Sequence, residues 1–454
     1  MFKKQVTNIF SSYEKYFIFA LTLLSLFPIL IIRANDFDTT FFWIYSILMT
    51  LFLFFMYYFT YKYKPLADIN HRPTVTVIVP CKNEEGAIEQ TITAIVESDY
   101  PADKLKVVVV DDGSTDRTYQ IAKQHEGNRV KVIRHGSNKG KRQAFATGFH
   151  SSDGEIVICI DSDTTVAKDA IRLLVQPFTD DNVVAVCGHG DAINKDKNLL
   201  TKIQHYWYQE MFTLIKGMES TLNAVTCCSG ILAAYRRDVV NEVIDEWLNE
   251  KFLGHKIFIG DDRQLTNLCA RGANGISAKD AKVVYQRNAI AYTIVPDNFN
   301  QFFKQQLRWK RAWVHGSALA GKFMWRKRFP VLLYFYTYQA LTFSSPVIIF
   351  TWIVLMPLRG AVTSTIIFLL SVLYIAFLHG LNTWCLSRNA KIKVIDYKAI
   401  DYIVYRMLFV PMSILLSLTV LPYAWSTLWK GGWVTRSNIE VTDEVSNVEE
   451  IVSN

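Results

Sequence analysis

Two long apolar regions bracket this chain and limit what it can fold into. Residues 16–60 and 331–428 are dominated by hydrophobic side chains, whereas the stretch between them has an ordinary mixed composition. Inside the first region, residues 16–32 and 41–59 each approach the roughly 20 residues that cross the hydrocarbon core of a bilayer. We therefore expect the two ends of the chain to sit in lipid and the middle to fold in water.

The charges around these runs predict their orientation. Lys3, Lys4 and Lys15 precede the first run, and Lys62 and Lys64 follow the second. Because loops rich in lysine and arginine stay on the cytoplasmic side, the amino terminus and the middle of the chain are expected in the cytoplasm of a multi-pass protein of the plasma membrane. The sequence after the first run lacks a small-residue cleavage site, which argues against a cleaved signal peptide.

The second apolar region divides into residues 331–358, 363–386 and 402–425. Only Arg359 lies between the first two stretches, whereas several basic residues precede the third, so the first two are expected to pass out and back. Pro411 in the third stretch favours a broken or re-entrant segment. The expected topology has four full spans, this broken unit and a cytoplasmic carboxyl terminus.

The expected organisation has five parts, and the charge pattern adds to it. The parts are two N-terminal membrane helices (1–65), a cytosolic domain (66–298), interfacial helices (299–330), a C-terminal membrane region (331–428) and a cytoplasmic tail (429–454). Residues 301–330 are rich in lysine and arginine and contain no acid, which is typical of contact with anionic lipid headgroups. The net charge of +8 therefore predicts membrane lipids, and no nucleic acid, as partners.

The middle of the chain alternates short β-branched runs with segments typical of helices. The runs cover residues 74–79, 105–110, 130–133, 156–160 and 183–186, and the helical segments 85–97, 115–125 and 139–149. Runs that are apolar throughout suit strands buried on both faces of a parallel sheet. We therefore expect an open α/β sheet whose ligand binds beyond the carboxyl ends of the strands.

Pairs of acids follow two of these strands. Asp111 and Asp112 come after the second run, and Asp161 and Asp163 follow the fourth, one residue apart. A strand–turn–helix junction explains the glycine and serine after the first pair but not two adjacent carboxylates at a buried strand end. Asp161 and Asp163 could share one cation. Hard oxygen ligands, completed by the oxygens of a diphosphate, select Mg²⁺ or Mn²⁺.

Two further loops combine charge with a helix start. Residues 137–142, Ser-Asn-Lys-Gly-Lys-Arg, form either a solvated turn or a site that brings cations and free backbone N–H groups to a phosphate. Asp261 and Asp262 open a helix after Gly260. They either stabilise the helix dipole, or one of them is a general base for a sugar hydroxyl.

An aromatic motif lies on the helical stretch 299–313. Gln305, Arg308 and Trp309 fall on one face at i, i+3 and i+4 spacing. An indole is a flat apolar platform suited to a sugar ring, and an arginine can reach a phosphate. The alternative is an interfacial helix with Trp and Arg at headgroup depth.

Taken in order, these motifs resemble the processive membrane glycosyltransferases of family two, which include the cellulose, chitin and hyaluronan synthases. The motifs are Val110-Asp111-Asp112-Gly113-Ser114, Asp161-Ser162-Asp163, Gly260-Asp261-Asp262 and Gln305-x-x-Arg308-Trp309. Finer features are similar to hyaluronan synthases, and the resemblance covers residues 74–436. These features are Asn138-Lys139-Gly140-Lys141-Arg142, Cys227-Cys228-Ser229-Gly230 and Trp433-Val434-Thr435-Arg436.

The resemblance implies a fold, a reaction and site residues. The fold is a GT-A-type, Rossmann-like α/β domain inserted between N-terminal and C-terminal transmembrane helices. The reaction is processive, inverting transfer from UDP-GlcNAc and UDP-GlcA to a growing β-linked polysaccharide that crosses the membrane, with Mn²⁺ or Mg²⁺ as cofactor. The implied residues are Asp262 and Asp261 in catalysis, Asp112, Lys141, Arg142, Asp161, Asp163 and Arg308 for the nucleotide sugar (Asp161 and Asp163 also for the metal), Ser229, Gly230, Gln305 and Trp309 for the acceptor, and Trp433, Thr435 and Arg436 for gating.

Departures from the family leave alternatives open. Residues 310–315 read Lys-Arg-Ala-Trp-Val-His where hyaluronan synthases have Ser and then Phe-Arg-Glu, and Val434 replaces a usual glycine. A chitin-type or poly-N-acetylglucosamine synthase that uses UDP-GlcNAc alone, or another capsule synthase, is the main alternative. A non-processive transferase to a lipid carrier is another, and the absence of a Gly-Lys-Ser/Thr loop argues against a transporter with a nucleotide-binding domain.

Overall fold

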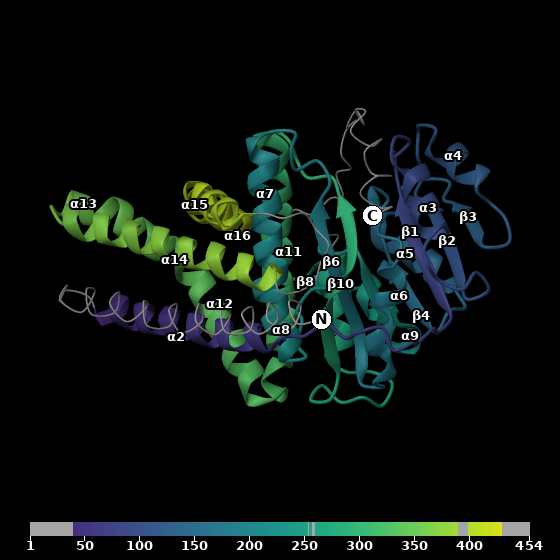
Figure 1. The fold of residues 1–454 in the computed structure, drawn as a ribbon, viewed down its shortest axis with the longest axis horizontal. Coiled ribbons are helices and arrows are strands. Elements are labelled where there is room, and N and C mark those ends of the chain that lie inside the picture. The colour runs from purple at the N-terminus through teal and green to yellow at the C-terminus, as the bar shows by residue number, and fades with distance from the viewer. Residues whose placement is uncertain (1–39, 253, 257–258, 389–397, 429–454) are drawn as a thin grey trace, which may run out of the picture.

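The computed structural model describes residues 40–252, 254–256, 259–388 and 398–428 (Figure 1). Its centre is a mixed sheet of eight strands in the order β3-β2-β1-β4-β7-β6-β10-β5. The strands are β1 (Val75–Cys81), β2 (Leu105–Asp111), β3 (Val130–Arg134), β4 (Ile156–Cys159), β5 (Thr164–Val166), β6 (Val183–Ala192), β7 (Ala233–Arg236) and β10 (Lys282–Thr293), and β8 (Lys251–Phe252) and β9 (His255–Lys256) form a separate pair.

The five strands expected from the apolar runs are confirmed as β1, β2, β3, β4 and β6, but the expectation of a parallel sheet is only partly right. Strands β3, β2, β1 and β4 are parallel. Strand β7 then runs antiparallel to both β4 and β6, and β5 runs antiparallel to β10. The short β7 thus joins the parallel half to β6 and β10, and the sheet as a whole is mixed.

Helices cover both faces of the sheet. Strand β1 shows why, because Val75, Val77 and Val79 belong to one hydrophobic cluster and the intervening Ile78 to another. The helices of the domain are α3 (Ile88–Val96), α4 (Thr118–Gln124), α5 (Lys141–His150), α6 (Ala170–Leu174), α7 (Leu199–Glu210), α8 (Gly217–Thr221), α9 (Arg237–Leu248), α10 (Asp261–Ala270) and α11 (Phe299–Gly321), with the 3-10 turns η1 (Gln176–Thr179) and η3 (Met324–Arg326) and the π-helical turn η2 (Met211–Lys216).

The C-terminal apolar region forms three long helices. They are Phe329–Leu358 (α12, Phe329–Phe350; η4, Thr351–Leu355; α13, Met356–Leu358), α14 (Val362–Arg388) and Ala399–Ser426 (α15, Ala399–Leu415; η5, Leu416–Val420; α16, Leu421–Ser426). Each is long and apolar enough to cross a membrane. In addition α2 (Thr40–Lys62) covers the second expected span, whereas the first, residues 16–32, lies outside the described residues.

The expected break at Pro411 is wrong. The helix runs without interruption from Ala399 to Ser426, with Pro411 inside it and a π-helical stretch five residues later. An apolar helix tolerates a proline when local π-type turns and hydroxyl side chains satisfy the freed backbone groups.

Helix α2 and helix α12 pack directly onto the domain that contains the sheet. Phe52, Met56 and Tyr57 of α2 share one hydrophobic cluster with Tyr334 of α12 and Tyr285 of β10. In Figure 1, α2 and α14 extend side by side away from the sheet, whereas α7 and α11 stand across them next to it. The sheet and the apolar helices α2 and α12 therefore share one hydrophobic core.

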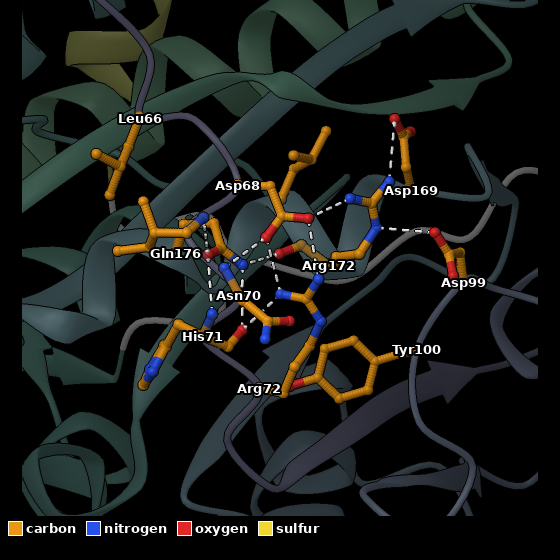
Figure 2. Close-up of polar contacts among 12 residues, drawn as sticks. Leu66, Asp68, Asn70, His71, Arg72, Asp99, Tyr100, Asp169, Arg172 and Gln176 are labelled. Atoms are coloured by element: carbon orange, nitrogen blue, oxygen red, sulfur yellow. Dashed lines mark hydrogen bonds and ion pairs between the residues drawn. The ribbon is translucent and has the colours of Figure 1, made fainter.

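The segment between α2 and β1 is tied to the sheet by polar contacts (Figure 2). Arg72 donates two hydrogen bonds to Asp68, each 2.9 Å long, and Arg172 of α6 forms an ion pair with the same carboxylate. The hydrogen bonds from Arg72, with further ones from Asn70 and Arg172, hold the pKa of Asp68 well below its usual range. This network fixes where helix α2 leaves the domain.

Candidate active site

Asp112 organises the loop in front of α5. It is fully buried at the end of β2, and its carboxylate accepts hydrogen bonds from the backbone N–H of Lys139 and of Gly140, both at 2.8 Å. The Nδ1 atom of His135 lies 2.7 Å from the same carboxylate. Gly113 is needed here because a Cβ atom on it would lie 2.8 Å from the Ser137 backbone. The strand-end motif and the 137–142 loop are thus one unit.

Lys141, at the start of α5, meets Asp161, which follows strand β4. Gly140 has a φ of 92°, and α5 begins directly after it, so Lys141 sits at the helix start. Its ammonium group forms an ion pair with Asp161. Burial would lower the pKa of Lys141, but Asp161, with Asp261 nearby, raises it above its ordinary value. A cation that stays charged at a helix N-terminus suits the diphosphate of a nucleotide sugar.

Asp163 follows Asp161 by two residues and comes directly before strand β5. It is half-buried. Among the described residues there is no cluster of three or more His, Cys, Asp or Glu side chains that could hold a metal by themselves. A site of one or two carboxylates fits Mg²⁺ or Mn²⁺ that takes its other ligands from substrate phosphates and water.

The two acids that open α10 have different partners. Asp262 accepts a hydrogen bond from the backbone N–H of Gly230 at 3.2 Å, and the Cys227 thiol lies 3.6 Å from the same oxygen. Asp261 accepts from Nε of Arg142 at 2.8 Å. Asp262 therefore faces the loop of residues 226–230, hereafter the acceptor loop, while Asp261 is held on the other side by an arginine.

Arg142 is occupied by the protein itself. Besides Asp261, it donates to the Trp247 carbonyl at 2.7 Å and lies 3.3 Å from Glu250. The side chain is buried, and its guanidinium stacks over the Trp247 ring at 5.3 Å. The expected contact of Arg142 with a nucleotide stays a prediction, and these contacts favour a role in holding Asp261.

The acceptor loop joins the donor side to Asp262. The Asp161 N–H donates to the Gly230 carbonyl at 3.0 Å, so Gly230 touches both acids through its backbone. A Cβ atom on Gly230 would lie 3.0 Å from the Asp161 carboxylate. The N–H of Cys228 donates to Thr266 of α10 at 2.9 Å. Ser229 lies between these two anchored residues.

The aromatic motif lies on helix α11, which packs against α10. The ring of Trp309 lies near Trp207 and Tyr208 of α7, with ring centroids 6.1 and 6.2 Å away. Gln305 and Arg308 are half-buried on the same helix. The Gln305 amide oxygen is buried without a hydrogen-bond partner among the described residues, which leaves an acceptor for a hydroxyl group. Trp433, Thr435 and Arg436 lie outside the described residues.

A small cavity lies between the acceptor loop and helix α12. Its volume is about 60 Å³, and residues of η2, α8, α10, α11 and α12 line it. Its wall includes Thr226 and Cys227 of the loop together with Lys216, Glu219 and Arg263, but neither Lys141 nor Asp161. The cavity is therefore a largely apolar space beside the acceptor loop, to which Lys216, Glu219 and Arg263 add charged groups.

Comparison with known proteins identifies the kind of enzyme that this site belongs to. A sequence profile of glycosyl transferase family 2 matches residues 76–244. A hyaluronan synthase of Streptococcus pyogenes serotype M3 is 30% identical over 311 residues, which are 66% of this chain and 72% of that protein. The chain belongs to glycosyl transferase family 2.

Other relatives agree with this assignment. An N-acetylglucosaminyltransferase of Neorhizobium galegae is 34% identical to this glycosyltransferase over 253 residues, which are 55% of this chain and 56% of that protein. A mannosyltransferase of Pyrobaculum calidifontis, solved with GDP-Man and Mn²⁺, superimposes with a TM-score of 0.54 at 21% identity over 85% of this chain and 99% of the other. The superposition shows a GT-A-like fold, and the resemblance to hyaluronan synthases is confirmed.

Sequence reasoning missed several residues of the glycosyltransferase site. His135 contacts Asp112, Lys216 donates to the Cys227 carbonyl, and Glu219 accepts from Thr226. None of these side chains belongs to a recognisable motif. Only the placement of Glu219 three residues after Lys216, on a segment that is otherwise largely apolar, could have drawn attention to them.

Substitution of Gly260 by alanine is expected to damage the site strongly. Gly260 has a φ of 72°, which costs an alanine about 1–2 kcal/mol. Its Cβ atom would also lie 2.6 Å from Cβ of Ala312 in α11, an overlap of the kind that costs about 1–3 kcal/mol. We expect a lower unfolding temperature and a lower transfer rate, measured by thermal unfolding and by release of nucleotide.

The matched control for Gly260→Ala is Gly275→Ala. Gly275 also has a positive φ, 76°, but a Cβ atom there meets open space. The control reports the backbone strain alone. Equal losses of stability in the two variants would show that the loop before α10 does not press on α11.

Proposed function

We propose that this glycosyltransferase is a processive polysaccharide synthase of the hyaluronan synthase type. It transfers sugars from UDP-GlcNAc and UDP-GlcA to a growing β-linked polymer and passes the polymer across the plasma membrane. The observation that carries the proposal is the position of Asp262. The Asp262 carboxylate accepts a hydrogen bond from Gly230 of the acceptor loop, and the carbonyl of Gly230 accepts one from Asp161, the ion-pair partner of Lys141. A small cavity lies between this loop and helix α12.

The arrangement supports a direct displacement at the anomeric carbon. Lys141 and Arg308 offer positive charge to the leaving diphosphate, and Asp262 accepts the proton of the acceptor hydroxyl. The new bond joins the acceptor oxygen to C1 of the donor sugar while the bond from C1 to the diphosphate breaks. Attack from the face opposite the leaving group inverts an α-linked donor into a β-linkage. Asp262 stands at the helix start where such a base is needed.

A divalent cation fits the donor side of this site. Asp161 and Asp163 would hold it, and Mn²⁺ in the related mannosyltransferase structure supports this assignment. When bound, the ion would neutralise charge on the leaving diphosphate. Asp112 shapes the loop that carries Lys141, so its expected part in nucleotide binding is most direct through that loop.

Trp309, with Gln305, is the proposed platform for the acceptor sugar. An indole offers a flat apolar face to a sugar ring, and the Gln305 amide oxygen can accept a hydrogen bond from a hydroxyl group. Ser229 and Gly230 form the opposite wall in this proposal. Trp433, Thr435 and Arg436 are proposed to close over the nucleotide.

The proposed topology places the catalytic domain in the cytoplasm. Tyr402 and Tyr405 near the start of α15 contact Tyr206 of α7, and Thr427 after α16 accepts hydrogen bonds from Arg311 of α11 at 2.7 and 3.1 Å. Both ends of this last helix therefore touch helices that pack on the domain. This supports a carboxyl terminus on the same side as the active site.

The test is a donor assay with the purified full-length protein in detergent and Mn²⁺. UDP-GlcNAc and UDP-GlcA are offered separately and together, and UDP release and polymer growth are followed. Polymer that needs both donors and is digested by hyaluronidase is the expected result. Turnover with neither donor would contradict the proposal.

A second candidate is a synthase that uses UDP-GlcNAc alone. The N-acetylglucosaminyltransferase relatives favour it. In the same assay it would give polymer, or a short lipid-linked product, from UDP-GlcNAc without UDP-GlcA. The roles of Lys141, Asp161 and Asp262 would be unchanged in that case.

A further inference from the structure

We propose that Glu219 is a positioning residue that fixes the acceptor loop to the apolar helix α12. Glu219 lies in α8, is 3% exposed and belongs to none of the motifs of the family resemblance. A buried carboxylate is costly unless hydrogen bonds satisfy it. Its partners therefore indicate what it is there to hold.

The partners of Glu219 come from two separate parts of the protein. One carboxylate oxygen accepts hydrogen bonds from the Thr226 hydroxyl at 2.8 Å and from the Tyr334 hydroxyl of α12 at 2.6 Å. The other accepts from the Thr226 N–H at 3.3 Å. A single buried carboxylate thus joins the first residue of the acceptor loop to a helix of the apolar region.

The rest of the acceptor loop is tied to the catalytic side. Gly230 donates to Asp262, and Cys228 donates to Thr266 of α10. Between the two attachments, the Cys227 carbonyl accepts a hydrogen bond from Lys216. The loop is therefore held between α10, which carries the proposed base, and the Glu219–Tyr334 contact.

Helix α2 steadies the segment that carries Glu219. Thr60 of α2 donates to the Leu214 carbonyl in η2 at 2.8 Å, and Thr221 of α8 donates to the Phe59 carbonyl at 3.0 Å. A π-helical turn such as η2 is rare and frequently marks a functional site. Because the segment that carries Glu219 is fixed to α2, the Glu219 carboxylate can hold the acceptor loop in one position.

This arrangement connects the apolar helices to retention of the polymer, a step that rests on the proposed function. After each transfer, the new end of the chain must be held again beside Asp262. A loop with one attachment missing holds that end less firmly, so the polymer leaves earlier. The donor side at Lys141 and Asp161 has no contact with Glu219 or Tyr334 among those found in the described residues, so donor turnover should persist.

The main variant is Tyr334→Phe, which removes one hydrogen bond and keeps the ring that stacks on Phe52. We expect the mean polymer length to fall roughly fivefold, the effect of one buried hydrogen bond. The initial rate of UDP release should stay within about twofold, because the donor contacts are intact. Polymer length is measured by size-exclusion chromatography and UDP by a coupled assay.

The matched control is Tyr336→Phe. Tyr336 lies in the same helix, but its hydroxyl donates to the Gly321 carbonyl, away from the acceptor loop. Glu219→Gln, which presents an amide N–H₂ group to the Thr226 N–H, should shorten the polymer further. Equal polymer lengths from Tyr334→Phe and Tyr336→Phe would overturn the proposal.

A second readout does not depend on polymer synthesis. Cys227 is the only half-buried thiol among the seven cysteines, and the other six are buried. Tyr334→Phe, but not Tyr336→Phe, should speed maleimide labelling of Cys227 by roughly fivefold, read by mass spectrometry. If the wild-type protein makes no polymer while this difference appears, the proposed function fails and the positioning role stands. Equal labelling rates contradict the positioning role alone.

A double-mutant cycle tests the shared carboxylate. Thr226→Val and Tyr334→Phe each remove one hydroxyl from the same oxygen of Glu219. If Glu219 couples them, the double variant should label at Cys227 no more than about twofold faster than the stronger single variant. Effects that multiply independently would show that the two hydroxyls act separately and would overturn the proposal.

Discussion

The Asp262→Asn variant is expected to lose sugar transfer by roughly 10³-fold, the size of effect that a general base contributes. The amide is nearly the same size as the carboxylate and can still accept the hydrogen bond from the Gly230 N–H. It cannot take a proton from the acceptor hydroxyl. Binding of UDP should be retained, because Lys141 and Asp161 are untouched. Release of UDP from the donor and equilibrium binding of UDP measure the two quantities.

The neighbouring Asp261 supplies the control for this prediction. Its carboxylate is held by Arg142, so Asp261→Asn keeps an oxygen for that hydrogen bond and removes only the charge. We expect a loss of roughly tenfold or less in transfer, since a hydrogen bond to a charged group contributes about 1.5–3 kcal/mol and the amide recovers part of it. A larger loss for Asp261→Asn than for Asp262→Asn would reverse the two assignments.

The sequence was informative about the fold where a strand is apolar on both faces. Strands β1, β2 and β4 stand out as continuous runs because both sides of each are buried. Strand β7, Ala-Ala-Tyr-Arg, is too short to show a pattern. Strand β10 contains Gln286 and Arg287, which suggest a surface segment, although both are buried by contacts with distant parts of the chain. Such pairings depend on tertiary packing and leave no local pattern.

For the site, too, some features could be predicted from the sequence and others could not. The residue types marked Asp161, Asp262 and Lys141 as candidates, but for Asp262 and Lys141 the sequence left a structural interpretation open, and the motif order of the family resemblance was needed to choose the functional one. Sequence could not tell that Asp112 would turn its carboxylate to the 137–140 loop. Nor could it pair Glu219 with Tyr334, which lie 115 positions apart. Partners of buried polar groups are set by the fold, whereas the identity of the groups is set by the chemistry.

Removal of divalent metal is expected to abolish sugar transfer, and Asp163→Asn should raise the metal concentration that transfer requires. Among the described residues the candidate ligands are too few to hold an ion without the donor diphosphate, so a chelator should strip it readily. We expect a loss of more than about 10²-fold in UDP release with EDTA, recovered on addition of Mn²⁺ or Mg²⁺. In the Asp163→Asn variant, the metal concentration for half-maximal activity should rise by roughly tenfold or more.

Asp153→Asn is the control for the metal prediction. Asp153 lies before β4, at the opposite end of the strand from Asp161, and its exposed carboxylate pairs with Lys106. The same substitution there changes the same charge at a distance from the site, so the metal titration should match that of the unaltered protein. If Asp163→Asn gave that same titration while EDTA still abolished transfer, the ion would have to be held by Asp161 and the diphosphate, and Asp163 would lose its assignment. Persistence of transfer in EDTA would instead place the neutralisation of the leaving diphosphate on Lys141 and Arg308, whose cations need no metal to act.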